Sequence, residues 1–345
     1  MTRRPRIRDV AELAGVAPST VSVVLNDTEG ARVAGSTRDR VRAAAAELGY
    51  VPNSLARGLR TQRSGTLAFI GDVIATTPYA GQLIQGAQDA AWEAGYLLML
   101  VNTGGDTTLE EHAVRALRQQ QVDGALYATM YHRSVTLPRV LDGLPTVLLD
   151  SRPAEGATTF VVPDEQQGAE SAVAELVRHG HRRIGFIRDL HDGPAVDRRL
   201  RGYQETLAAH GLEVDPGLVV RERSDSAGGD RAAGVLLDSE RPPSAIFAFN
   251  DQMAIGAYRA AASRGVRIPQ DLSVIGFDDL YVVSSELTPG LTTMALPHRE
   301  MGRLAARALI AERDGAEPAG ELLVPCPVVR RGSVGPVPPT AAAPR

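Results

Sequence analysis

The sequence contains one cysteine, Cys326, and no lysine among its 345 residues. A single cysteine cannot form an internal disulfide, so the composition is compatible with a reducing compartment. The longest aliphatic stretches, such as Leu97–Val101, are too short to cross a bilayer. The basic start of the chain, Met1–Arg6, is not followed by the apolar segment of an export signal. We therefore expect a cytoplasmic protein with no membrane partner.

Since lysine is absent, all 37 Lys and Arg positions are arginine, and they are distributed unevenly. Residues 1–63 contain 11 Arg and 6 Asp or Glu, a net charge of +5, whereas the remainder contains 26 Arg and 35 acidic residues, a net charge of −9. The formal net charge of −4 therefore conceals a basic first segment followed by an acidic body. Phosphate binding favours such a segment, although a solvated charged face would give the same balance.

Residues 7–49 predict three short helices separated by turns. The first helix ends at Gly15, and the second begins near Pro18, which the first turn of a helix tolerates. The third begins at Ser36, a favourable N-cap, and ends at Gly49. Two short helices joined by a tight turn, followed by a third, are typical of a helix-turn-helix module.

Apolar residues in this segment predict which faces are buried. Val10 and Leu13 are expected to pack the first helix, and Val16 and Val21 the inner face of the second. The third helix is expected to bury four residues: Val41, Ala44, Ala45 and Leu48. The outward N-terminal end of the second helix is then available to a major groove.

From Gly65 onward, apolar strand-like runs alternate with alanine-rich amphipathic stretches. This alternation predicts an α/β fold of parallel βαβ units with helices on both faces, and the length suits two such sheets. Several expected strands end in a polar residue, at the edge where open α/β sheets bind ligands. These residues are Asp72, Asn102, Asp150, Asn250 and Asp278.

A series of motifs makes one resemblance specific. Asp9-Val-Ala-Glu-Leu-Ala-Gly-Val16 is followed by Ser19-Thr-Val-Ser22 and Val24-Leu-Asn26, and then by Glu47-Leu-Gly-Tyr-Val-Pro-Asn53 and Ala56-Arg-Gly-Leu-Arg60. These motifs resemble the lactose/galactose repressor (LacI/GalR) family of bacterial transcription regulators, and the resemblance continues through the body. For the first segment alone, a small three-helix packing module is the alternative.

The resemblance implies a homodimer that binds a pseudo-palindromic double-stranded operator. It also implies that Pro18, Ser19 and Val23 face base edges. Thr20, Ser22 and Asn26 are implied to contact phosphates. Ala56 and Leu59, in the hinge, are further implied DNA contacts.

Two of these residues carry an alternative interpretation. Many relatives have an arginine where Val23 stands, and valine can touch only apolar features such as a thymine methyl group. Val23 could instead be a core residue. Leu59 matches the leucine that wedges into the minor groove, whereas an exposed linker leucine is the alternative.

Four stretches of the body match family signatures: Gly180–Gly185, Arg199–Tyr203, Asn250–Gly256 and Val274–Asp279. The resemblance implies an effector site between two lobes. Its implied residues are Asp72, Tyr79, Asp150, Arg199, Asn250 and Asp278. Carboxylate and amide oxygens accept hydrogen bonds from sugar hydroxyls and a guanidinium donates to them, so the implied effector is a small carbohydrate. Asp251 and Asp279 are expected to be structural instead.

The predicted organisation follows from the motifs and the resemblance together. It comprises a helix-turn-helix domain over residues 1–51, a hinge helix and linker over 52–64, a two-lobed, periplasmic-binding-protein-like effector and dimerisation domain over 65–332, and a disordered tail rich in proline and alanine over 333–345.

Other chemistry is sparse in the sequence. Neither a phosphate-binding P-loop, nor a Gly-x-Ser-x-Gly elbow, nor a His-Glu-x-x-His pair occurs, so we expect no enzyme and no cofactor. His179 and His181 lack further ligands and are expected to be satisfied at a helix end, without a metal. Cys326 is expected to be inert packing. A transport-type sugar-binding protein without DNA function remains the alternative function.

Overall fold

The computed structural model describes four stretches of the chain: residues 5–25, 32–50, 63–77 and 80–337. The chain divides into two compact units, Met1–Ser64 and Gly65–Arg345. No helix in the described stretches is both long and apolar enough to span a membrane.

The described part of the first unit is helical, with α1 (Ile7–Ala14), α2 (Pro18–Leu25) and α3 (Gly35–Leu48). Gly15 and Gly49 follow α1 and α3 with φ values of 64° and 61°. Glycine adopts this left-handed conformation without the steric penalty that a Cβ atom brings, so it ends both helices cleanly. The predicted order of helix, tight turn and helix is confirmed.

Small apolar residues form the core of this unit. The cluster consists of Val10, Ala11, Ala14, Val21, Val24, Val41, Ala44 and Ala45. The prediction that Leu13 packs α1 is wrong, because its side chain is 48% exposed. The buried face of α1 is centred on Val10, Ala11 and Ala14, and the 100° turn per residue puts Leu13 beyond the edge of that face.

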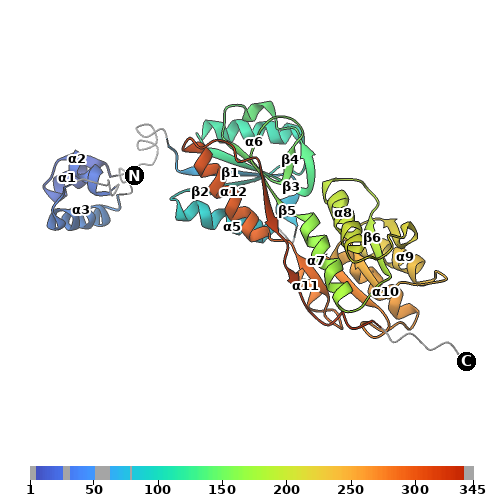
Figure 1. Cartoon of the computed structure of the whole chain (residues 1–345). Coiled ribbons are helices and arrows are strands. Elements are labelled where there is room, and N and C mark those ends of the chain that lie inside the picture. The colour runs from blue at the N-terminus through green and yellow to red at the C-terminus, as the bar shows by residue number, and fades with distance from the viewer. Residues whose placement is uncertain (1–4, 26–31, 51–62, 78–79, 338–345) are drawn as a thin grey trace, which may run out of the picture. The chain divides into compact units, whose positions relative to one another are not determined.

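The second unit contains two six-stranded sheets (Figure 1). The strands of the first sheet are β1 (Thr66–Gly71), β2 (Leu97–Asn102), β3 (Gly124–Val135), β4 (Thr146–Pro153), β5 (Phe160–Asp164) and β11 (Glu321–Pro325). The strands of the second are β6 (Ile184–Asp189), β7 (Val219–Glu222), β8 (Ala245–Ala248), β9 (Ser273–Asp278), β10 (Thr292–Ala295) and β12 (Val328–Val329). The two-lobed α/β prediction is confirmed.

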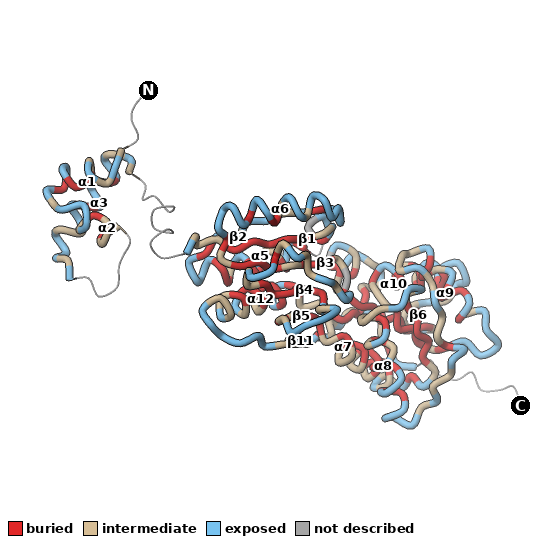
Figure 2. The backbone as a smooth tube through the Cα atoms, turned by 90° about the horizontal axis from the view of Figure 1, so that it is seen from above, coloured by how far each residue is buried: buried red, intermediate tan, exposed pale blue. Residues whose placement is uncertain are grey.

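Helices cover both sheets. The first lobe carries α5 (Ala80–Glu93), α6 (Thr107–Gln119) and α12 (His298–Arg313), with short 3-10 turns at Ile74–Thr76 and Arg139–Leu141. The second lobe carries α7 (Glu165–Arg178), α8 (Pro194–Ala209), α9 (Ser226–Leu237), α10 (Asp251–Ser263) and α11 (Tyr281–Ser284), with a 3-10 turn at Pro216–Leu218. Figure 2 shows that burial concentrates on the strands and on the helix faces turned toward them.

The order of the strands reveals how the lobes are connected. The first sheet runs β11-β5-β4-β3-β1-β2, and the second runs β12-β10-β9-β8-β6-β7. Neighbouring strands are parallel except β10 and β12. The chain therefore crosses between the lobes three times: after β5, after β10 and after β11.

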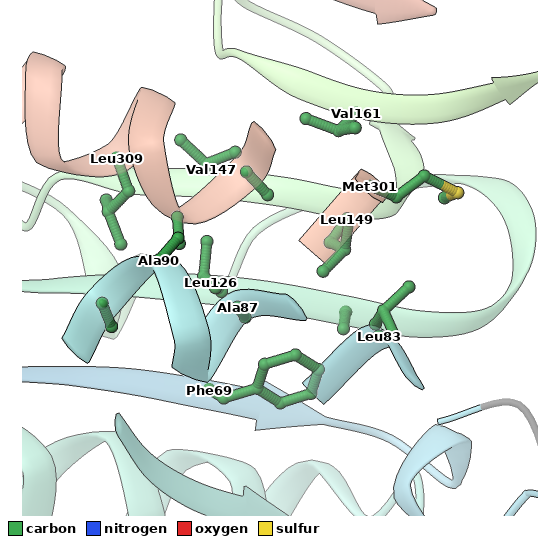
Figure 3. Packing of buried hydrophobic residues seen from close by; sticks show 14 of the residues in the cluster. Phe69, Leu83, Ala87, Ala90, Leu126, Val147, Leu149, Val161, Met301 and Leu309 are labelled. Carbon is green, nitrogen blue, oxygen red and sulfur yellow. The ribbon is translucent and has the colours of Figure 1, made fainter. Parts of the chain in front are cut away.

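Each lobe has a hydrophobic core on both faces of its sheet. In the first lobe, α5 and α12 pack together over β1, β3, β4 and β5, where Phe69, Leu126 and Leu149 meet Met301 and Leu309 (Figure 3). The other face of this sheet packs against α6. In the second lobe, α9 and α10 cover one face, and α7 and α8 cover an aromatic stack on the other.

The C-terminal segment is ordered further than the sequence predicts. The hydroxyl of Ser333 donates to the carbonyl of Val274 at 2.6 Å and accepts from the N–H of Thr292 at 2.8 Å. The N–H of Val337 donates to the carbonyl of His179 at 2.9 Å. The prediction that disorder begins at Ser333 is wrong for residues 333–337, because tertiary hydrogen bonds hold a segment that has no periodicity of its own.

Glycines allow the paired helices to approach closely. A Cβ atom on Gly86 of α5 would lie 1.9 Å from the carbonyl oxygen of Arg299 in α12. One on Gly302 of α12 would lie 2.1 Å from the carbonyl oxygen of Leu83. A Cβ atom on Gly256 of α10 would lie 2.3 Å from the carbonyl oxygen of Ser226 in α9. Any side chain at these positions would push two helix backbones apart.

We predict that Gly86→Ala destabilises the second unit by about 1–3 kcal/mol, the usual cost of overpacking. Gly81→Ala is the matched control, because it lies on the same helix with no atom within 4 Å of the added Cβ. It should be neutral or stabilise by about 0.5–1 kcal/mol, since alanine is the better helix former. Urea unfolding followed by circular dichroism measures both, and equal stabilities would contradict the close packing of α5 and α12.

Candidate functional site

The N-terminal end of α2 is the accessible part of the helix-turn-helix. Pro18 and Ser19 are exposed, while Thr20 and Ser22 are half-buried. Proline in the first helical turn costs no hydrogen bond, because the N–H it lacks would have had no partner inside the helix. This end of α2 is therefore open to a DNA groove in the way that a recognition helix requires.

Val23 lies outside the core of the first unit. It is half-buried and does not belong to the cluster that contains its neighbours Val21 and Val24. The alternative of Val23 as a core residue is not supported by this packing. Four other predicted contacts lie outside the described residues and stay predictions: Asn26, Ala56, Leu59 and Tyr79.

Arg199 of α8 is the centre of the predicted effector site, and its side chain is 4% exposed. Its Nε donates to Glu165 Oε2 at 2.6 Å, its Nη1 donates to the carbonyl of Phe249, and its Nη2 lies 3.9 Å from Asp278 Oδ1. The guanidinium carbon lies 3.6 Å from the ring centroid of Phe277 and 4.4 Å from that of Phe249. Burial alone would lower the pKa of Arg199, but the carboxylates of Glu165 and Asp278 outweigh burial and raise it. The group is therefore a fixed positive charge.

Asp150 of β4 brings the first lobe to the same place. It is buried and adopts a φ of 54°, a left-handed conformation that Asp tolerates better than most residues. Burial raises the pKa of its carboxyl well above the usual value; the charges of Glu165 and Asp278 raise it further, and Arg199 opposes them. Within the described residues no hydrogen bond reaches this carboxylate. Asp150, Arg199 and Asp278 thus form one electrostatically coupled group drawn from both lobes.

Asp72 and Asn250 are nearby but have structural partners. Asp72, directly after β1, accepts from the N–H of Ile74 at 2.9 Å and from Arg133 Nη2 at 3.0 Å. Asn250 caps α10, because its Oδ1 accepts from the N–H of Met253 at 2.8 Å. Their side chains are held in position by the fold, which leaves their remaining hydrogen-bonding capacity for a ligand.

Asp251 and Asp279 have the structural roles expected of them. Asp251 is fully buried and accepts from the hydroxyls of Thr293 at 2.6 Å and Ser284 at 2.7 Å. Asp279 pairs with Arg331 at 2.7 Å. Both bind parts of their own lobe together.

The remaining polar and thiol candidates are also structural. His181 is fully buried, with Nδ1 2.9 Å from the hydroxyl of Ser244 and Nε2 2.9 Å from that of Ser273. Cys326 is buried, and burial raises the pKa of its thiol. In the part of the chain that the structure describes, no group of three or more His, Cys, Asp or Glu residues is placed to hold a metal ion.

The sequence did not reveal two kinds of residue at this site. Glu165, the buried partner of Arg199, directly follows β5 and begins α7, and the sequence pattern gave no sign of its pairing with Arg199. Phe249 and Phe277, which sandwich the guanidinium, directly precede two predicted residues, Asn250 and Asp278. The fact that each directly precedes a predicted site residue was the signal in the sequence that could have identified these two aromatic residues.

Comparison with protein families matches both units of the chain. Residues 6–53 match the model of bacterial regulatory proteins of the lacI family, and residues 173–334 match a periplasmic binding protein-like domain. The ribose operon repressor of Escherichia coli (strain K12) is 35% identical over 306 residues, which cover 88% of this chain and 92% of the repressor. The chain belongs to the LacI family of bacterial regulatory proteins. The resemblance inferred from the motifs is confirmed.

Solved structures of other LacI-family regulators match nearly the whole chain. A complex of the transcriptional regulator CelR with cellobiose is 33% identical, with a TM-score of 0.67, and the match covers 96% of this chain and all of CelR. A lac repressor dimer bound to operator and the anti-inducer ONPF is 26% identical, with a TM-score of 0.78 and the same coverage.

For this LacI-family chain we predict that Asp150→Asn raises the Tm of the ligand-free protein near neutral pH. Because the folded-state pKa of Asp150 is raised, its ionisation costs stability as the pH rises above the unfolded-state value. The gain should therefore shrink toward acid pH, where the carboxyl is protonated in both states. Thermal melts across this pH range measure the difference. The control is Asp142→Asn at an exposed position, and equal pH profiles for the two variants would contradict the burial of the Asp150 charge.

Proposed function

We propose that this chain is a sequence-specific DNA-binding transcriptional repressor whose operator affinity is controlled by a small carbohydrate bound between the two lobes. The observation that carries the proposal is the coupled group of Asp150, Arg199 and Asp278, which is drawn from both lobes of a chain that also has a LacI-type helix-turn-helix. A ligand that contacts both lobes binds one lobe arrangement better than another, and it shifts their equilibrium by that difference.

The chemistry of this group supports a polyhydroxylated ligand. The carboxylates of Asp150 and Asp278 accept hydrogen bonds from hydroxyl groups, and the amide of Asn250 adds both a donor and an acceptor. Arg199 is neutralised by Glu165 and Asp278, so the site offers no uncompensated positive charge to an anion. Among relatives, one is a repressor of a ribose operon and another was solved with cellobiose.

We propose that DNA is read by the outward end of α2. Pro18, Ser19 and Val23 face base edges, with Thr20 and Ser22 at phosphates. Asn26, Ala56 and Leu59 complete the proposed contacts on sequence grounds alone. Because Val23 offers only methyl groups, thymine methyl contact is favoured over the hydrogen bonds that an arginine would make to guanine.

We propose that the working form is a homodimer. A pseudo-palindromic operator needs two reading units related by a two-fold axis. The first sheet has an open edge at β2, where Leu97, Met99 and Leu100 are exposed. An exposed apolar edge strand is a surface suited to association, and the related lac repressor was solved as a dimer on its operator.

The test is fluorescence anisotropy of the full chain with DNA from its own upstream region, in the presence and absence of single sugars from a panel that includes ribose and cellobiose. We expect operator binding at least tenfold tighter than binding to random DNA, and a change of at least tenfold with one sugar. Sedimentation of the complex should give two chains per operator. Sugar binding without operator preference would favour the transport-type alternative, and DNA binding unaffected by any sugar would contradict a carbohydrate effector.

Two neighbouring valines of α2 allow DNA contact and core packing to be tested separately. Val23→Ala should leave the Tm unchanged and weaken discrimination at one base pair by about 1–3 kcal/mol, the usual value for one contact. Val24→Ala should instead lower the stability of the first unit by about 1–3 kcal/mol, because Val24 is 1% exposed and its methyl groups fill the core. Operator-variant titrations and thermal melts measure both. The same loss of stability in both variants would place Val23 in the core.

A further inference from the structure

His132 of β3 is buried at the junction of the two lobes, with 6% of its surface exposed. The pairing of β3 with β4 shifts register between Ala128 and Arg133, so this residue stands in an irregular part of the strand. β3 belongs to the first lobe, and it contacts α8 of the second, which carries Arg199 (Figure 1). His132 is therefore next to the proposed effector site.

Neither ring nitrogen of His132 has a hydrogen-bond partner among the described residues. Buried polar atoms without partners cost free energy and are rare, so each one calls for a physical explanation. Three arginines lie within electrostatic range of the ring, Arg152 from the first lobe and Arg198 and Arg199 from the second. Burial, followed by these charges, lowers the pKa of His132 to about 3. The ring is thus neutral, with one donor and one acceptor nitrogen.

A second buried histidine, His181 in the other lobe, is held by hydrogen bonds to its own lobe. Both nitrogens of His181 meet partners, the hydroxyls of Ser244 and Ser273, and the carbonyl of Gly335 lies 3.0 Å from Nε2. His181 thereby joins β-strand ends of one lobe to the C-terminal segment. The ring nitrogens of His132 make no such hydrogen bonds among the described residues, so they do not hold the fold together in this arrangement of the lobes.

The second lobe approaches His132 through α8, which contacts β3. Arg198 of α8 also donates to Glu321 of β11 at 2.5 Å, which ties α8 to the first lobe. A ligand that enters between β3 and α8 would reach the ring nitrogens when the lobes move apart. Such a ligand would supply the hydrogen-bond partners that the ring nitrogens lack in the described stretches of the protein.

We propose that His132 is a direct hydrogen-bonding contact of the carbohydrate effector. One ring nitrogen accepts from a sugar hydroxyl and the other donates to a hydroxyl oxygen. This inference rests on the proposed function and adds a specificity-determining residue from β3 to the residues at the strand ends. Since His132 lies where β3 meets α8, a ligand on its ring would be sensitive to how the two lobes are arranged, and such a difference in affinity is what a shift between arrangements requires.

The test compares His132→Leu, His132→Gln and wild type by titration calorimetry with cellobiose, ribose and the other sugars of the panel. For the sugar that wild type binds, His132→Leu should weaken the affinity at least tenfold, and His132→Gln, which keeps a donor and an acceptor, should recover most of the loss. The Tm of ligand-free His132→Leu should be equal to or above that of wild type, because the variant removes unsatisfied polar atoms.

His181→Ala is the matched control. It should lower the Tm clearly, since Ser244, Ser273 and Gly335 lose their partner, while the affinity of the folded protein for the sugar stays within twofold of wild type. Should His132→Leu fail to fold, His132→Phe keeps the ring shape and takes its place, and a loss of stability in both would show that His132 is structural and overturn the proposal.

The two proposals fail in different ways. If wild type binds a sugar and His132→Leu binds it equally well, the contact to His132 is refuted and the carbohydrate function stands. If wild type binds no sugar of the panel, the carbohydrate function fails and the inference about His132 fails with it.

Discussion

The burial of one permanently charged group, the guanidinium of Arg199, constrains the centre of the effector domain. Removing such a group from water costs several kcal/mol, and only paired carboxylates, carbonyl acceptors and aromatic faces offset that cost. Glu165, Phe249, Phe277 and Asp278 supply all of these around it. They come from the end of β8, the end of β9 and the start of α7, so satisfying one charge on α8 brings these three elements together around it.

The first lobe contributes polar side chains to this region that lack hydrogen-bond partners among the described residues. Asp150 brings a third carboxylate close to Arg199 without a hydrogen bond of its own among the described residues, and His132 brings two unsatisfied nitrogens. The buried polar groups around Arg199 in the second lobe have partners, whereas these two of the first lobe have none in the part of the chain that the structure describes. A ligand with hydroxyl groups would supply the missing hydrogen bonds and so gain binding free energy. Stability and binding therefore oppose each other at these residues, as is common where function depends on a site.

Local patterns predicted most of the fold. Strand–helix alternation is a property of short windows, so the two-sheet α/β organisation was predicted, together with polar residues at the ends of strands such as Asn102 and Asp278. Features that depend on distant partners were not. Leu13 is exposed because the other helices pack on the face of α1 that carries Val10, Ala11 and Ala14, and Ser333 is ordered because it bonds to Val274 and Thr292. For the same reason, the charged strand ends were predicted, whereas the pairing of Arg199 with Glu165 was not.

The three crossings between the lobes have a consequence for how the chain is made. The first sheet takes its edge strand, β11, from residues 321–325, and one of its covering helices, α12, from residues 298–313. A nascent chain that has left the ribosome up to Asp164 therefore lacks an edge strand and one of the three covering helices of its own first lobe. Since domains usually fold as units during synthesis, the lobe that begins first should finish last, after the second lobe has been almost completely synthesised. Both sheets are completed only by the last strands of the chain, β11 in the first lobe and β12 in the second.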